Sequence, residues 1–191
     1  YDPFRLTNCS LKSLETDSKL FKVGILGRVT QSKGLDHFFN LVESLSLPQL
    51  KKYCFLFFGS ADSNDDWVIN FKNRLSNYND LNYHFMGFVF DQSKLYSSID
   101  MLLHLNENEP LGRIIFETIN ANLPFLCSCK GGTGELARNL RLGHFTFENV
   151  SEIGSKIGKI HQQNELLITA RKVIEQEYTS EQYAKRIEKL F

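Results

Sequence analysis

The amino-acid sequence predicts an α/β fold in which a parallel sheet is flanked by helices, and two observations carry this prediction. Short apolar runs of strand length alternate with segments whose apolar residues have helical spacing, which is typical of βαβ units. The apolar runs are continuous rather than alternating in polarity, as expected when helices cover both faces of a sheet. Ligands of such sheets bind beyond the carboxyl ends of the strands, so a functional site is expected in the loops that follow them.

The individual elements follow from this pattern. Strands are expected at the apolar runs Phe21–Leu26, Tyr53–Phe58, Asn82–Met86, Met101–Leu105, Pro124–Ser128 and His144–Phe147. Helices are expected at Leu35–Leu45, Trp67–Leu75, Leu111–Ala121, Val150–Ile160, Glu165–Glu177 and Ser180–Leu190. Residues 1–20 have no clean period and are interpreted as a linker or edge segment.

Composition excludes several classes of protein. The chain has 191 residues, which suits one domain with an appended terminal element, and its formal net charge of zero argues against nucleic acid as the main partner. No apolar run approaches the roughly 20 residues of a membrane helix, and no signal-peptide pattern opens the chain. The four cysteines have neither Cys-x-x-Cys nor zinc-site spacing. They are interpreted as buried reduced thiols, which favours a cytoplasmic location.

The loop after the first expected strand contains two cations. Gly27 permits a tight exit from the strand, and Arg28 and Lys33 then stand near the start of the next helix. Arginine grips a diphosphate with a planar fork and lysine acts as a point charge, so the pair suits a diphosphate ligand. A solvated basic turn is the alternative.

The loop after the fourth expected strand runs into a helix start. Pro110 suits the first helical position, where its missing N–H is not needed. Leu111, Gly112 and Arg113 would then offer unpaired backbone N–H groups at the positive end of the helix dipole, which is an anion site. Gly112 would let a ligand approach the backbone closely.

Two acids flank this expected helix start. Glu117 lies five residues after Gly112, or about 7.5 Å along a helix axis, which matches the span from a phosphate to the ribose of a nucleotide. Its carboxylate can accept hydrogen bonds from both ribose hydroxyls, whereas Glu109 lies on the other side of the phosphate, where a sugar would lie. The alternatives are a helix-start acid for Glu109 and an i,i+4 pair of Glu117 with Arg113.

The loop after the fifth expected strand contains three glycines, at positions 131, 132 and 134. They indicate either a backbone that comes close to a ligand or a tight turn before a helix.

In this order the three loops resemble the donor-binding half of glycosyltransferase family 4, retaining enzymes with the GT-B architecture of two facing Rossmann-like domains. That family has a Gly-Arg…Lys-Gly loop, a Glu-x7-Glu element and a Gly-Gly-x-x-Glu element. The corresponding residues here are Gly27-Arg28 with Lys33-Gly34, Glu109 with Glu117, Gly131-Gly132 with Glu135, and also Phe85–Val89 and Leu95-Tyr96 before Asp100.

The resemblance implies a role for each site residue. Arg28 and Lys33, after Gly27, would hold the donor diphosphate, and with Glu109 they would be the catalytic groups. Glu109 and the backbone at Leu111 and Gly112 would face the donor sugar. The backbone N–H groups of Arg113 and Ile114 would bind the phosphates, and Glu117 would bind the ribose. Phe88 and Val89 would line the base pocket, mostly by main chain.

The resemblance also implies an arrangement of domains. Residues 1–20 would link to an absent N-terminal acceptor domain, 21–177 would form the Rossmann-like nucleotide-sugar domain, and 178–191 would be a C-terminal crossover helix. The parent enzyme would transfer a sugar from a UDP- or GDP-linked donor to a glycan or lipid-linked acceptor, as in polysaccharide assembly. It would act in the cytoplasm or in association with a membrane. The chain alone would be inactive.

Two alternatives differ from this hypothesis in function. One is a non-catalytic nucleotide-sugar-binding or scaffold domain, against which the presence of Arg28, Lys33, Glu109 and Glu117 argues. The other is a different GT-B enzyme such as a nucleotide-sugar epimerase, against which the Glu-x7-Glu spacing argues. No cofactor and no metal ion are expected, since the sequence contains no Asp-x-Asp element to hold a divalent ion against the phosphates.

Overall fold

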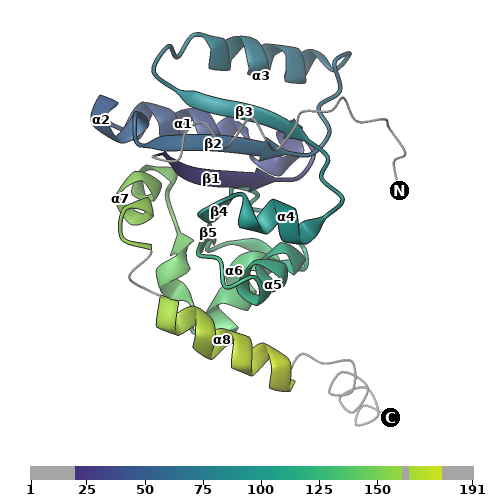
Figure 1. Ribbon diagram of the computed structural model, residues 1–191, viewed down its shortest axis with the longest axis vertical. Helices are drawn as coiled ribbons and strands as arrows, with labels where there is room; N and C mark the ends of the chain where they lie inside the picture. The colour runs from purple at the N-terminus through teal and green to yellow at the C-terminus, as the bar shows by residue number, and fades with distance from the viewer. Residues whose placement is uncertain (1–19, 161–163, 178–191) are drawn as a thin grey trace.

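The computed structural model describes residues 20–160 and 164–177, and it confirms the predicted α/β class (Figure 1). Six parallel strands form one sheet in the order β3-β2-β1-β4-β5-β6. The order reverses between β1 and β4, and in such sheets the ligand crevice opens at this reversal. The strands are β1 (Phe21–Leu26), β2 (Tyr53–Phe58), β3 (Asn82–Gly87), β4 (Met101–His104), β5 (Phe125–Ser128) and β6 (Thr146–Phe147).

The strands lie where the apolar runs predict them. All side chains of β2 are buried, as a continuous apolar run between two helical layers requires. The last strand is shorter than expected, because Gly143–Phe145 form a 3-10 turn and only Thr146–Phe147 pair with β5.

Most of the predicted helices are present within the described residues. The helices are α1 (Asp36–Ser44), α2 (Leu47–Leu50), α3 (Asp66–Ser76), α4 (Gln92–Ser97), α5 (Arg113–Asn120), α6 (Gly131–Asn139), α7 (Ile153–Ile157) and α8 (Asn164–Glu177). Three of them, α2, α4 and α6, were not assigned from the sequence. The expected helix at Ser180–Leu190 and the segment 1–19 lie outside the described residues.

The two faces of the sheet carry different helices. Phe38 of α1 packs edge-on against Phe55 and Phe57 of β2, and Phe71 of α3 packs against the same Phe57. Gly24 of β1 pairs with Leu56, which lies between Phe55 and Phe57 in β2. Since side chains alternate along a strand, Gly24 belongs to the face opposite the one that α1 and α3 cover. There, a Cβ on Gly24 would lie 2.5 Å from Cδ1 of Ile99, so the absence of a side chain lets the segment after α4 lie close to β1.

The second face carries the helices that border the expected site. A hydrogen bond joins α4 to α5, and α5 in turn contacts α8 (Figure 1). Helices α4 and α5 follow β3 and β4 in the chain, so their N-termini lie at the carboxyl edge of the sheet.

Two expectations from composition can be compared with the structure. Cys54 and Cys127 are buried as predicted, Cys129 is partly exposed, and Cys9 lies outside the described residues. Over 20–160 and 164–177, no helix has both the length and the apolar character needed to cross a membrane.

Candidate functional site

The loop after β1 is held against the end of β4 by a glycine. Residues Gln31–Lys33 form a 3-10 turn that ends at Gly34, whose backbone has a φ of +72°. A Cβ on Gly34 would lie 2.3 Å from the carbonyl oxygen of Leu105, so only glycine allows this approach. The turn therefore delivers Lys33 to the loop that follows β4.

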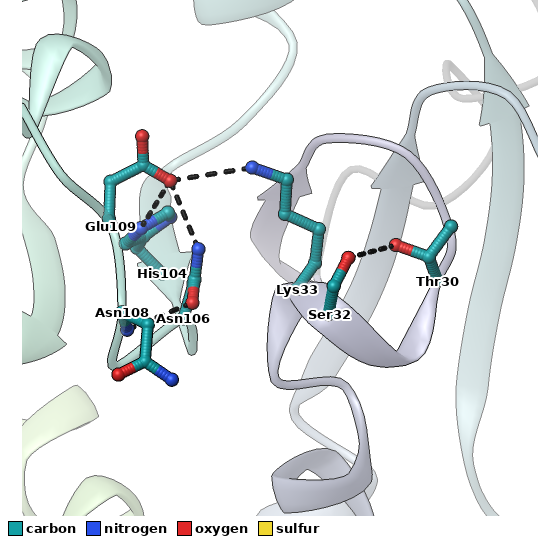
Figure 2. Close-up of polar contacts among 7 residues, drawn as sticks. All are labelled: Thr30, Ser32, Lys33, His104, Asn106, Asn108 and Glu109. Atoms are coloured by element: carbon teal, nitrogen blue, oxygen red, sulfur yellow. Dashed lines mark hydrogen bonds and ion pairs between the residues drawn. The ribbon is translucent and has the colours of Figure 1, made fainter.

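Lys33 and Glu109 meet where the strand order reverses. Lys33 Nζ lies 3.4 Å from Glu109 Oε2, and their side chains are 33% and 21% exposed. Asn106 Nδ2 donates to the same oxygen at 3.1 Å, and Asn106 Oδ1 accepts from the backbone N–H of Asn108 at 3.0 Å. Figure 2 shows these groups converging on the Glu109 carboxylate. Both contacts, from Lys33 and from Asn106, therefore hold the Glu109 carboxylate through Oε2.

Beneath this pair lies His104, which sequence reasoning did not select. Its Nε2 is buried, has no hydrogen-bond partner among the described residues, and lies 3.9 Å from Glu109 Oε2 (Figure 2). Burial lowers the pKa of His104 from 6.5 to about 4; Glu109 opposes the shift and Lys33 adds to it. The imidazole is therefore neutral at neutral pH.

We expect this buried histidine to make the domain sensitive to mild acid. The unfolded chain binds a proton below the ordinary pKa of 6.5, whereas folded His104 resists it down to about 4. Stability from His104 is thus fully present above pH 6.5 and is lost as the pH falls toward 4. Between pH 7 and pH 5 the free energy of unfolding should fall by about 2 kcal/mol through this group.

Urea unfolding of the wild type and of His104→Leu at both pH values measures this effect. The loss between pH 7 and pH 5 should be about 2 kcal/mol smaller in the variant. His84→Gln, at an exposed position of β3, is the control and should behave as the wild type. Equal losses in all three proteins would contradict the prediction.

A small pocket lies between the ends of β1 and β4. Its lining includes Gly27, Arg28, Lys33 and His104. Arg28 is exposed and has no ion-pair partner among the described residues, whereas Lys33 is already paired with Glu109. Arg28 and Lys33 therefore line the same pocket, as two cations that bind one anion must. Within residues 20–160 and 164–177, no three His, Cys, Asp or Glu side chains gather as metal ligands would.

The helix start after β4 differs from the expectation. Pro110 and Leu111 precede the helix, which begins at Arg113 after Gly112 as its N-cap. Gly112 has a φ of +60°, and a Cβ added to it would lie 3.1 Å from Thr133 Cα of α6. The absence of a side chain thus lets α6 lie against this loop, while close approach of a ligand to the backbone at Gly112 stays a prediction. The amides of Arg113 and Ile114 donate no hydrogen bond to the described residues, as expected for a first helical turn.

Glu117 lies one helical turn further along α5. Tyr96 Oη donates to its Oε2 at 2.9 Å, and Arg113 Nε lies 3.5 Å from its Oε1. The i,i+4 pair considered from the sequence is therefore present, although Arg113 is 86% exposed, so the pair contributes little. Sequence reasoning missed the contact with Tyr96, which comes from another helix.

The three glycines after β5 pack closely against the backbone of neighbouring loops. They lie within α6, and a Cβ on Gly132 would be 2.2 Å from the carbonyl oxygen of Pro110. The N–H of Gly132 donates to the carbonyl oxygen of Glu109 at 2.6 Å. Lys130, which precedes the helix, pairs with Glu107 at 2.8 Å. Helix α6 thus supports the backbone of the loop that carries Glu109.

Phe88 and Val89 follow β3 at the same edge of the sheet. Strand β2 separates β3 from β1, so the structure does not bring these residues into contact with Lys33 or Glu109. Phe88 is 52% exposed and packs edge-on against Phe90, with ring centroids 4.7 Å apart.

Solved structures resemble this domain over most of its length. HepE of Anabaena, crystallised with UDP and glucose, is 20% identical with a TM-score of 0.71, over 94% of this chain and 51% of HepE. The C-terminal domain of LpcC, a group 1 family glycosyltransferase of Francisella tularensis, is 16% identical with a TM-score of 0.66, over 91% of this chain and 95% of that one. The fold is therefore that of GT-B glycosyltransferase C-terminal domains.

Sequence comparisons agree with the fold. An uncharacterised 42.6 kDa protein in the cps region of Klebsiella pneumoniae is 29% identical over 164 residues, or 86% of this chain. The chain spans 40% of that relative and 51% of HepE. The family described as Glycosyl transferases group 1 matches residues 10–179. The chain belongs to the glycosyl transferases group 1 family.

Proposed function

We propose that this chain is the donor-binding half of a retaining glycosyltransferase of family 4, which transfers a sugar from a nucleoside diphosphate to a glycan or lipid-linked acceptor. The meeting of Lys33 and Glu109 carries this proposal. They come from loops after different strands, yet lie 3.4 Å apart at the reversal of strand order. A cation for phosphate and a carboxylate for a sugar are thus adjacent, as a sugar diphosphate requires.

The diphosphate would lie over the ends of β1 and β4. Arg28 and Lys33 border the pocket there. The unpaired amides of Arg113 and Ile114 are at the positive end of the α5 dipole and can donate to phosphate oxygens. The proposed anion is therefore met by two side-chain cations and two backbone donors, without a metal ion.

The nucleoside would extend from the phosphates along α5. Glu117 is 30% exposed and can accept hydrogen bonds from the ribose hydroxyls. The main chain at Phe88 and Val89 would border the base. The complex of HepE with UDP and glucose makes a UDP-linked donor the first to test, and a GDP-linked donor the second.

The chemistry follows from these charges. As the bond between the anomeric carbon and the diphosphate breaks, negative charge grows on the leaving phosphate and positive charge on the sugar. Arg28 and Lys33 would stabilise the former, and Glu109, which Asn106 and Lys33 hold in place, would stabilise the latter. The acceptor hydroxyl would attack from the face that the diphosphate leaves and pass its proton to the departing phosphate oxygen, so the anomeric configuration is retained.

The acceptor would be held by a second domain. We propose that residues 21–177 bind the donor and that this second domain lies outside them. Transfer requires both reactants within about 3–3.5 Å in a site closed to water, so the donor-binding half alone would not turn over.

Calorimetric titration of the chain with UDP and GDP in EDTA tests the proposal. One nucleotide should bind without metal, and Lys33→Ala should weaken it about tenfold or more, because a charge-assisted contact contributes about 1.5–3 kcal/mol.

A matched control separates the site from general charge effects. Lys51 also forms an ion pair at 3.4 Å, with Asp80, and it precedes β2 at the opposite edge of the sheet. Lys51→Ala should bind as the wild type does. Absence of binding by the wild type, or equal affinity of the two variants, would contradict the proposed site. Binding that collapses in EDTA and returns with Mg²⁺ would contradict its metal independence.

A further inference from the structure

We propose that Tyr96 is a positioning residue that orients Glu117 toward the nucleotide's ribose, so that discrimination between ribose and a sugar without hydroxyls depends on Tyr96. The inference rests on the function proposed above. It concerns a side chain from α4, an element outside the loops that carry the other site residues.

The contact is short and involves the acidic partner of the proposed ribose contact. Tyr96 Oη donates to Glu117 Oε2 at 2.9 Å, within the normal range for a hydroxyl and a carboxylate. Tyr96 is 9% exposed, whereas the Glu117 side chain is 30% exposed. The hydrogen-bond donor, Tyr96, is therefore buried, whereas the acceptor, the Glu117 carboxylate, is exposed enough to contact a ligand.

Helix α4 holds the tyrosine in place. Asp91 caps its N-terminus by accepting the N–H of Lys94 at 3.1 Å, and the neighbouring Leu95 is buried in the core. The hydroxyl therefore approaches Glu117 from a fixed backbone. Burial and the Glu117 carboxylate raise the pKa of Tyr96, so the hydroxyl keeps its proton and remains a donor.

The carboxylate needs such a donor because its other partner is weak. Arg113 lies 3.5 Å from Oε1 and is 86% exposed, so solvent screens this pair. Without Tyr96, the Glu117 side chain would be free to leave the rotamer that faces the proposed ribose. With it, one acceptor position of Oε2 is occupied, and Oε1 with the remaining position of Oε2 stays available to two ribose hydroxyls.

The experiment compares two nucleotides rather than one. Wild type, Tyr96→Phe and Tyr78→Phe are titrated with UDP and with 2′,3′-dideoxyuridine diphosphate, which lacks both hydroxyls. GDP and its dideoxy analogue replace them if GDP is the nucleotide that binds. Tyr78 is the matched control, since its hydroxyl donates to Glu43 at 2.7 Å on the opposite face of the sheet.

The wild type and Tyr78→Phe should prefer the ribonucleotide by about tenfold, and Tyr96→Phe should reduce this preference to about twofold through weaker ribonucleotide binding alone. In a Glu117→Ala background, Tyr96→Phe should change nothing further, because Tyr96 acts through that carboxylate. An unchanged preference, or equal weakening of both nucleotides, would overturn the inference while the proposed function stands. Failure of the wild type to bind any nucleoside diphosphate would overturn both.

Discussion

Replacing Glu109 with alanine is expected to lower turnover of the full-length enzyme about 100-fold or more, while nucleoside diphosphate binding to this chain stays within a few-fold of wild type. Removing one preorganised group that acts on developing charge costs about 10²–10³ in turnover. The bare diphosphate lacks the sugar that Glu109 would face. It also gains from a Lys33 that no longer shares its charge with a carboxylate 3.4 Å away.

Steady-state kinetics with a sugar donor, beside calorimetry with the bare diphosphate, measure the two effects separately. Glu107→Ala is the control, because Glu107 is in the same loop but pairs with Lys130 at 2.8 Å. It should retain turnover near the wild-type rate. Loss of diphosphate binding in Glu109→Ala with turnover per bound donor intact would assign this acid to the nucleotide instead.

Gly132→Ala is expected to lower the free energy of unfolding by about 3–5 kcal/mol. Adding atoms to a packed core usually costs about 1–3 kcal/mol of stability. The cost at Gly132 should be larger, because the new methyl group would clash with backbone atoms, which cannot move aside as a side chain can. The new Cβ would lie 2.2 Å from the Pro110 carbonyl oxygen and 2.8 Å from that of Glu109. Moving α6 and the loop apart to make room would strain the hydrogen bond from the Gly132 N–H to the Glu109 carbonyl oxygen at 2.6 Å.

Denaturant unfolding measures this loss, and two glycines serve as controls. A Cβ added at Gly143 or Gly158 would meet no atom within 4 Å, so alanine at either position should change stability by no more than about 1 kcal/mol. A Gly132→Ala protein as stable as these controls would show that α6 does not support the loop.

The strands were predictable because their signal is local. A continuous apolar run such as Tyr53–Phe58 is compatible with few arrangements other than a strand covered on both faces, and all its side chains are buried. Helix α4 was missed because Gln92–Ser97 bury only Leu95 and Tyr96, too few residues to show a period. Asp91, its N-cap, was the available signal.

The candidate site was predictable in part. Arg28, Lys33 and Glu109 were selected because they lie in loops that follow strands, and Glu117 because of its spacing from Gly112; the fold places Lys33 beside Glu109. Their roles toward a donor stay predictions. The roles of His104 and Tyr96 were not predicted. His104 lies in the apolar run Met101–Leu105, and its position 3.9 Å from Glu109 depends on how the loop after β4 folds back. Tyr96 contacts Glu117, 21 residues further along the chain, at 2.9 Å.

The helix start at Arg113 shows a different limit of sequence reasoning. Proline before an apolar period predicts a helix from about that residue, but here the turn continues to Gly112. The contact involved is long-range: α6 lies against Pro110 and Gly112, and the absence of a side chain on Gly132 allows this approach. Two glycines after β5, Gly131 and Gly132, therefore lie directly against the loop that precedes β5.

The strand order also has a consequence for biosynthesis. β1 pairs with β2 on one side and with β4 on the other, and Lys33 and Glu109 are 76 residues apart in the chain. Ribosomes add about 5–20 residues per second, so roughly 4–15 s separate the appearance of the two residues. During that interval β1 presents an unpaired edge, which is a template for pairing with another nascent chain. The pocket between the ends of β1 and β4 can thus form only after β4 has been synthesised and has paired with that edge.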